Sequence, residues 1–327
     1  MNKIEKIWYG TSLWQYVLLP LSGLFCLLAI LKRLTYRFGL VKPQQVSVPI
    51  IVIGNISVGG TGKTPLVTWM VDHLRSLGYK PAIVSRGYGG NATKWPQQVR
   101  KDSDPRMVGD ETVLLARRCD CPVSAAPRRI AAARALLQHT DCDIIISDDG
   151  MQHYDMHREL EIAVVDGVRR FGNGYCLPAG PLREPIGRLD SVDMVVVNGI
   201  ASRNEFSMKL KGERISRIDK SYIAQPLNAL AGCKVHAVAG IGNPKRFFDQ
   251  LRVAGLEVIE HPMPDHHPFE ERDIQFDDEL PVIMTEKDAV KCQHFVDERH
   301  WVLPVNAELD DVFVHRLNLL LKRINNG

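Results

Sequence analysis

The fold of this chain is decided by the stretch Ser57–Pro65, which has the sequence Ser-Val-Gly-Gly-Thr-Gly-Lys-Thr-Pro. The apolar run 48–53 before it is typical of a short buried strand, and 66–74 after it has the composition of a helix. A strand, a glycine-rich turn, Gly-Lys-Thr and a helix in this order predict a phosphate-binding loop. Glycines let backbone N–H groups surround a phosphate without clashes, and the start of the helix adds partial positive charge.

The residue types in this loop match the chemistry of a bound nucleotide. We expect Lys63 to neutralise the β- and γ-phosphates and the Thr64 hydroxyl to bind Mg²⁺. The usual pattern opens with glycine, separated by four residues from Gly-Lys-Thr, and here Ser57 takes that place. The alternative is a glycine-rich turn that binds no ligand. Our prediction is that the phosphates of a nucleotide are bound by Ser57, Gly59, Gly60, Thr61, Gly62, Lys63 and Thr64.

The composition sets limits on the class of protein. The chain has 327 residues, which is enough for one large or two ordinary domains. Its net charge of +3 gives no basic field, so we expect no nucleic-acid partner. The seven cysteines are odd in number and have no framework spacing, which favours a reducing compartment. No obligate protein partner is inferred.

The N-terminal segment 1–40 is predicted to associate with a membrane. No charged residue lies between Ile7 and Leu31, a length that is sufficient to cross a hydrocarbon layer of about 30 Å. Tryptophans and tyrosines gather at one end, as at lipid headgroups, and basic residues flank both ends. A cleaved signal peptide is disfavoured because no small-residue cleavage site follows. A buried core helix remains an alternative, and the hydropathy does not distinguish a helix that spans the membrane from one that lies in it.

Acidic residues follow two further segments of this first unit. Asp148 and Asp149 end an apolar strand, the usual second half of a phosphate-loop site, where a carboxylate holds Mg²⁺ directly or through water. Asp110 and Glu111 begin a helix, where two explanations stay open. They either complement the helix dipole or supply a general base for a substrate hydroxyl.

A long irregular stretch, 167–189, carries Arg183 and Glu184. Loops of this length without regular structure are usually functional or disordered. Arg183 is a candidate for binding phosphate, and Glu184 for binding Mg²⁺ or a sugar hydroxyl. The alternative for this pair is an exposed ion pair.

From residue 227 onward the alternation of strands and helices starts again. We therefore predict an α/β protein with a phosphate-loop NTPase-like domain at 41–226 and a smaller α/β domain at 227–327. The first domain has a parallel sheet with helices on both faces. Asp265, His266 and His267 follow a strand of the second domain. They either orient a base across the domain cleft or form a simple solvated turn.

The motifs in their order resemble the tetraacyldisaccharide 4′-kinase family, the lipid A 4′-kinases of Gram-negative bacteria. The resemblance covers nearly the whole chain, including the apolar N-terminal helix, and the family carries serine where this chain has Ser57. It rests on seven stretches: 57–65, 85–89, 108–111, 148–153, 181–185, 265–267 and 285–288.

The resemblance implies a function in lipid A biosynthesis. Members of this family transfer the ATP γ-phosphate to the 4′-hydroxyl of an acylated glucosamine disaccharide 1-phosphate lipid, at the cytoplasmic face of the inner membrane. Carried onto this chain, it makes Lys63 catalytic and Asp110 the base, assisted by His266 in preference to His267. The predicted ligands of Mg²⁺ are Thr64, Asp148, Asp149, Glu111 and Glu184, and Arg183 is assigned to phosphate.

Rival functions also have a nucleotide loop and a membrane helix. A membrane-associated regulatory ATPase of the type that dimerises through a lysine just before Gly-Gly is disfavoured, because Val58 takes that place. A GTP-dependent switch needs Asn-Lys-x-Asp to read guanine, and Thr285–Asp288 places its lysine one position late. A non-catalytic scaffold with a relict loop is disfavoured by the full set of carboxylates.

Overall fold

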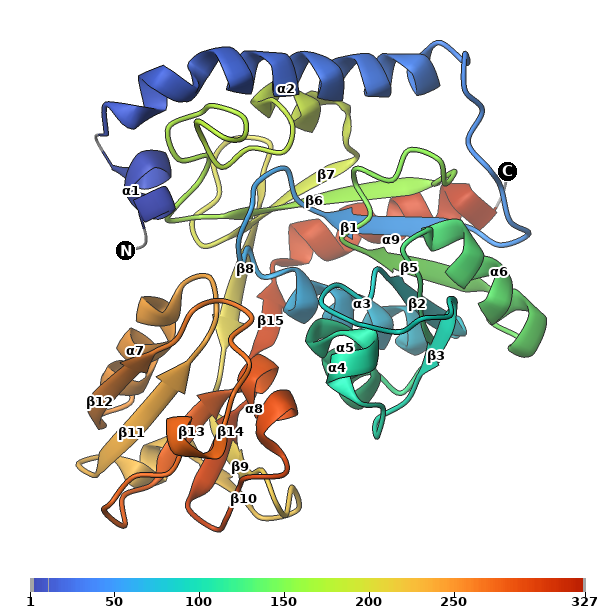
Figure 1. Cartoon of the computed structure of the whole chain (residues 1–327). Helices are drawn as coiled ribbons and strands as arrows, with labels where there is room; N and C mark the ends of the chain where they lie inside the picture. The colour runs from blue at the N-terminus through green and yellow to red at the C-terminus, as the bar shows by residue number, and fades with distance from the viewer. Residues whose placement is uncertain (1–2, 11, 326–327) are drawn as a thin grey trace.

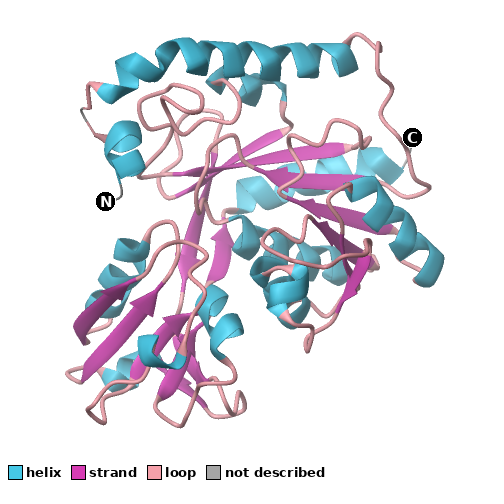
Figure 2. Ribbon diagram, viewed as in Figure 1, coloured by secondary structure: helices cyan, strands magenta, loops and turns pink. Residues whose placement is uncertain are grey.

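The computed structural model describes residues 3–10 and 12–325, and this part of the chain forms two sheets (Figures 1 and 2). The larger sheet has nine strands in the order β15-β8-β7-β6-β1-β5-β2-β4-β3. Its central strands are parallel, and the outermost pairs, β15 with β8 and β3 with β4, are antiparallel. The strands are Ile50–Gly54 (β1), Pro81–Ser85 (β2), Gln97–Val99 (β3), Val123–Ala125 (β4), Ile144–Asp148 (β5), Leu160–Asp166 (β6), Met194–Asn198 (β7), Phe206–Lys211 (β8) and Asn306–Leu309 (β15).

Strand β1 is buried on both faces, which explains its unbroken run of apolar residues. Ile51 and Ile53 pack into one core, and Ile50 and Val52 pack into another on the opposite face. The first core is closed by α3 (Lys63–Ser76), α5 (Asp110–Arg118) and α9 (Asp311–Asn325), and the second by α6 (Arg129–His139). The predicted parallel sheet with helices on both faces is confirmed.

The second sheet has six strands in the order β10-β9-β14-β13-β11-β12 and forms a separate lobe below the first domain (Figure 1). Its core strand β11 pairs in parallel with β12 and β13, as expected for an α/β unit. Its elements are Arg214–Arg217 (β9), Ala224–Pro226 (β10), Leu227–Leu230 (η2), Lys234–Ala239 (β11), Pro244–Val253 (α7), Glu257–Pro262 (β12), Glu271–Asp273 (η3), Val282–Thr285 (β13), Glu286–Cys292 (α8) and His300–Leu303 (β14).

The sheets divide the chain differently from the predicted boundary at 226/227. Strands β9 and β10 precede that boundary but belong to the second sheet, and β15 and α9 follow it but return to the first domain. Phe313 and Leu317 of α9 are fully buried in the core of the larger sheet. The chain therefore crosses between the two domains twice. The return of β15 and α9 to the first domain depends on long-range packing, which no local sequence pattern predicts.

Short elements between β2 and α6 also differ from the prediction. The sequence analysis did not predict β3, β4 or the single turn α4 (Pro105–Val108). Gly109 has a φ of +91°, and a Cβ there would lie 2.5 Å from the Tyr88 carbonyl oxygen. This glycine separates α4 from α5, so that α5 begins at Asp110.

The N-terminal segment forms α1 (Lys3–Tyr9) and α2 (Trp14–Arg37), and α2 runs along the outside of the larger domain (Figure 1). Its mean hydropathy is 1.9, its length suffices to cross a membrane, and only 6% of the apolar window is buried. The contacts that hold it include hydrogen bonds and a stacking of Tyr36 on Tyr154. Ser22 donates to the Cys176 carbonyl at 2.7 Å, and Lys32 donates to that of Gln152 at 3.1 Å. An exposed helix of this kind does not fit the alternative of a buried core helix.

Candidate active site

The loop between β1 and α3 has a backbone that only glycine adopts easily. Gly59 and Gly62 have φ angles of +113° and +98°, and a Cβ on Gly62 would lie 2.8 Å from Nδ2 of Asn198. That amide also donates to the Thr61 carbonyl at 3.2 Å, which fixes the end of the loop. Residues 58–65 line a cavity between the two domains, whereas Ser57 is buried beside Leu182, with which it forms an isolated bridge.

Lys63 extends back across the loop toward two oxygen-bearing side chains. Its Nζ lies 3.3 Å from Oδ1 of Asn55 and 3.4 Å from Oδ1 of Asp149. Asn55 is fully buried directly after β1. The ammonium is therefore held by neighbours at the place where the phosphate-loop motif puts the phosphates of a nucleotide.

The two aspartates at the end of β5 lie in opposite electrostatic environments. Burial, with the charges of Glu111 and Asp149 nearby, raises the pKa of Asp148 to about 7. Its Oδ2 accepts from Ser85 at 3.2 Å, and its Oδ1 has no hydrogen-bond partner among the described residues. Burial also acts on Asp149, but the cations of Lys63 and Arg183 outweigh it and hold the pKa of that carboxyl well below its usual range.

Arg183 reaches the site because its loop pairs with the phosphate-binding loop. The backbone N–H of Val58 donates to the Pro181 carbonyl at 2.8 Å, and that of Arg183 donates to the Ile56 carbonyl at 2.6 Å. The guanidinium Nη1 then lies 3.1 and 2.9 Å from the two oxygens of Asp149. Arg183 lines the same cavity as Lys63, as the sequence predicts.

Asp110 and His266 meet across the gap between the domains. Nδ1 of His266 lies 3.2 Å from Oδ2 of Asp110, and the N–H of Glu111 donates to its Oδ1 at 2.8 Å. Burial alone would raise the pKa of Asp110, but His266, Lys287 and Lys291 together lower it. His267 instead bonds to Asp273 at 2.9 Å, so the structure favours His266 for the predicted pairing.

Glu111 lies at the same cavity and has a cationic partner from the second domain. Its Oε1 is 3.1 Å from Nζ of Lys287. Lys287 also contacts Asp265 at 3.1 Å and Nε2 of His266 at 3.2 Å. A single lysine of α8 thus links the acidic start of α5 to the Asp265–His267 turn.

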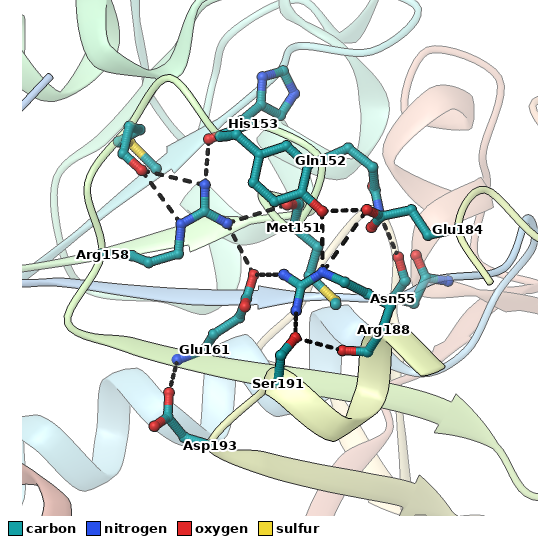
Figure 3. A network of polar contacts seen from close by, with 12 residues as sticks. Asn55, Met151, Gln152, His153, Arg158, Glu161, Glu184, Arg188, Ser191 and Asp193 are labelled. Carbon is teal, nitrogen blue, oxygen red and sulfur yellow. Dashed lines mark hydrogen bonds and ion pairs between the residues drawn. The ribbon is translucent and has the colours of Figure 1, made fainter. Parts of the chain in front are cut away.

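Glu184 does not lie with the other predicted Mg²⁺ ligands. It is 2% exposed and belongs to an internal network with Gln152 and Arg188 (Figure 3). Gln152 donates to its Oε2 at 2.8 Å, and its Oε1 accepts from the hydroxyl of Tyr154. Both carboxylate oxygens are engaged, and Glu184 is not among the residues that line the cavity. This placement corrects the prediction that Glu184 binds Mg²⁺.

The cavity has a volume of about 810 Å³ and joins both domains. The first domain contributes the phosphate-binding loop and the ends of β2 and β5, and the second contributes α7, β14 and the turn at Asp265. An ion pair and a hydrogen bond to the backbone connect the two domains beside it. Arg118 lies 2.7 Å from Glu286, and Arg246 donates to the Asn198 carbonyl at 3.2 Å.

Several residues of the site were not predicted from the sequence. Asn55 and Asn198 directly follow or end a buried strand, and this position was the signal that could have indicated them. Arg129 is fully buried and donates to the carbonyls of Asp148 and Asp149 at 3.3 Å each. Burial lowers the pKa of Arg129 to about 10. Nothing in the local sequence of α6, the helix that Arg129 begins, indicated this role.

This chain is similar to known proteins along nearly its whole length. The model of the family described as tetraacyldisaccharide-1-P 4′-kinase matches residues 14–322. The tetraacyldisaccharide 4′-kinase of Nitrosococcus oceani is 50% identical, with 98% of this chain and 94% of the relative aligned. That of Methylobacillus flagellatus is 49% identical, with coverages of 98% and 96%.

A solved structure extends the similarity to three dimensions. LpxK from Aquifex aeolicus in complex with ATP superposes with a TM-score of 0.81 and 27% identity, over 95% of this chain and 99% of that one. The same two-domain arrangement is therefore present in a protein of known structure. On the family match and on relatives half identical along nearly its whole length, this chain belongs to the tetraacyldisaccharide-1-P 4′-kinase family.

Proposed function

We propose that this protein transfers the γ-phosphate of ATP to the 4′-hydroxyl of a tetraacyldisaccharide 1-phosphate lipid in lipid A biosynthesis. The observation that carries the proposal is a cavity lined by both Lys63 and His266, with Asp110 beside that histidine. Phosphoryl transfer needs a cation at the phosphates and a proton acceptor at the hydroxyl. Family membership supplies the identity of the acceptor.

ATP is the proposed phosphate donor. The Aquifex aeolicus relative was solved in complex with ATP, and this chain has the phosphate-binding loop in the same fold. The backbone N–H groups of residues 59–62, Lys63 and Arg183 are the proposed phosphate contacts, which lie along one edge of the cavity.

The donor set at this edge fits Mg²⁺. The orphaned Oδ1 of Asp148 and the hydroxyl of Thr64 are hard oxygen ligands of the kind that Mg²⁺ prefers. Asp149 and Glu111 each already form an ion pair with a lysine. We therefore propose that they contribute negative charge around the ion and do not bind it directly. When bound, the ion would neutralise the negative charge that develops on the phosphates.

Asp110 is the proposed base for the 4′-hydroxyl. The cations around it lower the pKa of its carboxyl, so it is ionised and ready to accept a proton at neutral pH. Its Oδ1 and Oδ2 are oriented by the Glu111 N–H and by His266, respectively. The role of Lys63 is to hold the transferring phosphate and stabilise its charge in the transition state.

The lipid acceptor accounts for the exposed apolar helix α2. We propose that α2 attaches the enzyme to the cytoplasmic face of the inner membrane, with its apolar side chains among the acyl chains. Five of them, Val17, Leu21, Leu24, Leu28 and Leu31, are between 48% and 66% exposed. The enzyme then meets its lipid substrate without extracting it into water.

A phosphate-transfer assay tests the proposal. Purified protein, ATP labelled in the γ-phosphate, Mg²⁺ and the detergent-dispersed lipid are mixed, with Asp110→Ala beside the wild type. We expect label in the lipid and a fall of about 10² or more in the variant. Asp120→Ala, an exposed position after the same helix, is the matched control. If no label reaches the lipid and both proteins hydrolyse ATP equally, the regulatory-ATPase alternative is favoured instead.

A further inference from the structure

Lys287 makes three polar contacts with neighbours from two parts of the fold, the start of α5 and the Asp265–His267 turn. Its Nζ lies 3.1 Å from Oε1 of Glu111, 3.1 Å from Oδ1 of Asp265 and 3.2 Å from Nε2 of His266. The side chain is 14% exposed. Burial acts to lower the pKa of Lys287, but the three carboxylates of Glu111, Asp265 and Asp110 outweigh it and raise that pKa. The ammonium is therefore charged under all ordinary conditions.

The local structure holds this ammonium in place. Thr285 caps α8 by accepting from the Asp288 N–H at 3.3 Å. Asp288 is fully buried and accepts from the Gly240 N–H at 2.8 Å. The stretch Thr285–Asp288 thus fixes the start of α8 against its own sheet, and Lys287 is aimed out of that start toward the first domain.

The contact with Lys287 selects between the two neutral tautomers of His266. An ammonium has donors only, so a ring nitrogen that bonds to Nζ at 3.2 Å is the acceptor. In the neutral ring that makes this bond, Nε2 carries no proton and the single N–H is at Nδ1. That N–H points at Oδ2 of Asp110, 3.2 Å away.

We propose, resting on the kinase function above, that Lys287 is a positioning residue that selects this tautomer of His266. With Nε2 occupied by the ammonium and Nδ1 protonated, the neutral ring of His266 donates to Asp110. The proton of the acceptor hydroxyl then stays on the Asp110 carboxyl during the reaction. His266 and Lys287, both from the second domain, together orient Asp110, the proposed base in the first domain.

The groups around His266 both raise and lower its pKa. The hydrogen bond to Asp110 raises the pKa of His266, and burial and the Lys287 charge oppose that rise. The remaining neighbours are Asp265 at 4.0 Å from Nε2, Lys291 at 3.9 Å from Oδ2 of Asp110, and the Tyr88 ring at 5.1 Å. Among the described residues, Lys287 is the one charged side chain within hydrogen-bond distance of Nε2 of His266. Its substitution by an uncharged residue removes that charge.

The first measurement uses the unaltered enzyme. In protein labelled with ¹⁵N at histidine, His266 is assigned by comparison with His266→Gln, and we expect Nε2 in the range of an unprotonated acceptor at neutral pH. A His266 that carries its proton on Nε2 would overturn the proposal, whatever any variant does.

The second measurement is the pH dependence of lipid phosphorylation in Lys287→Met. The acidic limb, which reports the Asp110–His266 pair, should move up by about one pH unit or more because a unit charge at this separation is lost. The KM for ATP should change less than twofold, since Lys63 and the loop are untouched. Lys287→Arg keeps the charge and the donors and should restore the limb.

The matched control is Arg117→Met. Arg117 lies on α5 as Asp110 does and also contacts the second domain, through Gln293 at 3.0 Å, but it does not contact His266. The acidic limb of the pH profile of Arg117→Met should coincide with that of the wild type. If Lys287→Met and Arg117→Met give the same profile, Lys287 is a structural contact and the inference fails. If the wild type itself transfers no phosphate to the lipid, the proposed function fails instead.

Discussion

Asp148 and Asp149 are neighbours in the chain, yet their surroundings drive their carboxyl pKa values in opposite directions. Asp148 is buried beside Glu111 and keeps one oxygen without a partner, whereas Asp149 holds Lys63 and Arg183. At the scale of the residue, therefore, function depends on which cation a side chain meets. In the proposed function, the two aspartates therefore take two roles: Asp148 is open to a metal ion, and Asp149 orders Lys63 and Arg183.

His153 gives a prediction at the same scale. Burial, together with the cations of Arg129, Arg86 and Lys32, lowers the pKa of His153 to about 4. The folded protein then holds a neutral ring where the unfolded chain, with a pKa near 6.5, takes up a proton. The stabilisation is present above pH 6.5 and is lost as the pH falls toward 4. Between pH 7 and pH 5 the wild type should lose about 1–2 kcal/mol more than His153→Asn.

Urea unfolding at the two pH values measures this difference. His139→Asn, at an exposed histidine that ends α6, is the control and should follow the wild type. Equal losses in the wild type and in His153→Asn would show that His153 does not set the acid sensitivity.

At the scale of the element, α2 combines an exposed apolar surface with a few polar attachments. Val17, Leu21, Leu24, Leu28 and Leu31 are spaced by three or four residues, so they lie along one stripe of the helix. Ser22 is the one residue of α2 that is buried, and it is hydrogen-bonded to the domain beneath. The helix therefore has a face for the protein and a face free for lipid.

This division predicts how α2 responds to charge. Leu24→Glu combined with Leu28→Glu should weaken binding to vesicles of phosphatidylethanolamine and phosphatidylglycerol by tenfold or more, since burying each leucine contributes about 1.5–3 kcal/mol. The unfolding temperature should not change, because both side chains are more than half exposed. Val168→Glu with Ile200→Glu, at exposed loop positions, is the control. Unchanged vesicle binding would contradict the role given to α2.

At the scale of the whole molecule, the active site exists only where the two domains meet. Arg118 at the end of α5 lies 2.7 Å from Glu286 at the start of α8, and each side chain is less than 20% exposed. Burial raises the pKa of Glu286, and Arg118 opposes that rise. We expect Arg118→Met and Glu286→Gln each to destabilise the protein, because either one leaves a buried group without its partner.

A double-mutant cycle on this pair tests the interface. The free energies of unfolding of the two single variants and the double variant should show a coupling of about 1–3 kcal/mol. The Arg75–Asp120 pair, which is exposed, should give a coupling near the surface range of about 0–1 kcal/mol. Additive single effects at Arg118 and Glu286 would mean that the pair does not hold the domains together.

The sequence by itself determined the local chemistry: the strand, loop and helix around Lys63, the aspartates that end β5, the second α/β unit and the apolar helix α2. These follow from hydrophobic patterns, glycines and charges within a few residues of one another. Only the tertiary structure decided what depends on distant segments. It returned β15 and α9 to the first domain, placed Glu184 in an internal network away from the cavity, and brought His266 to Asp110 and Lys287 to Glu111. The physical reason is that burial and charge pairing between segments 30 to 176 residues apart leave no trace in a local pattern.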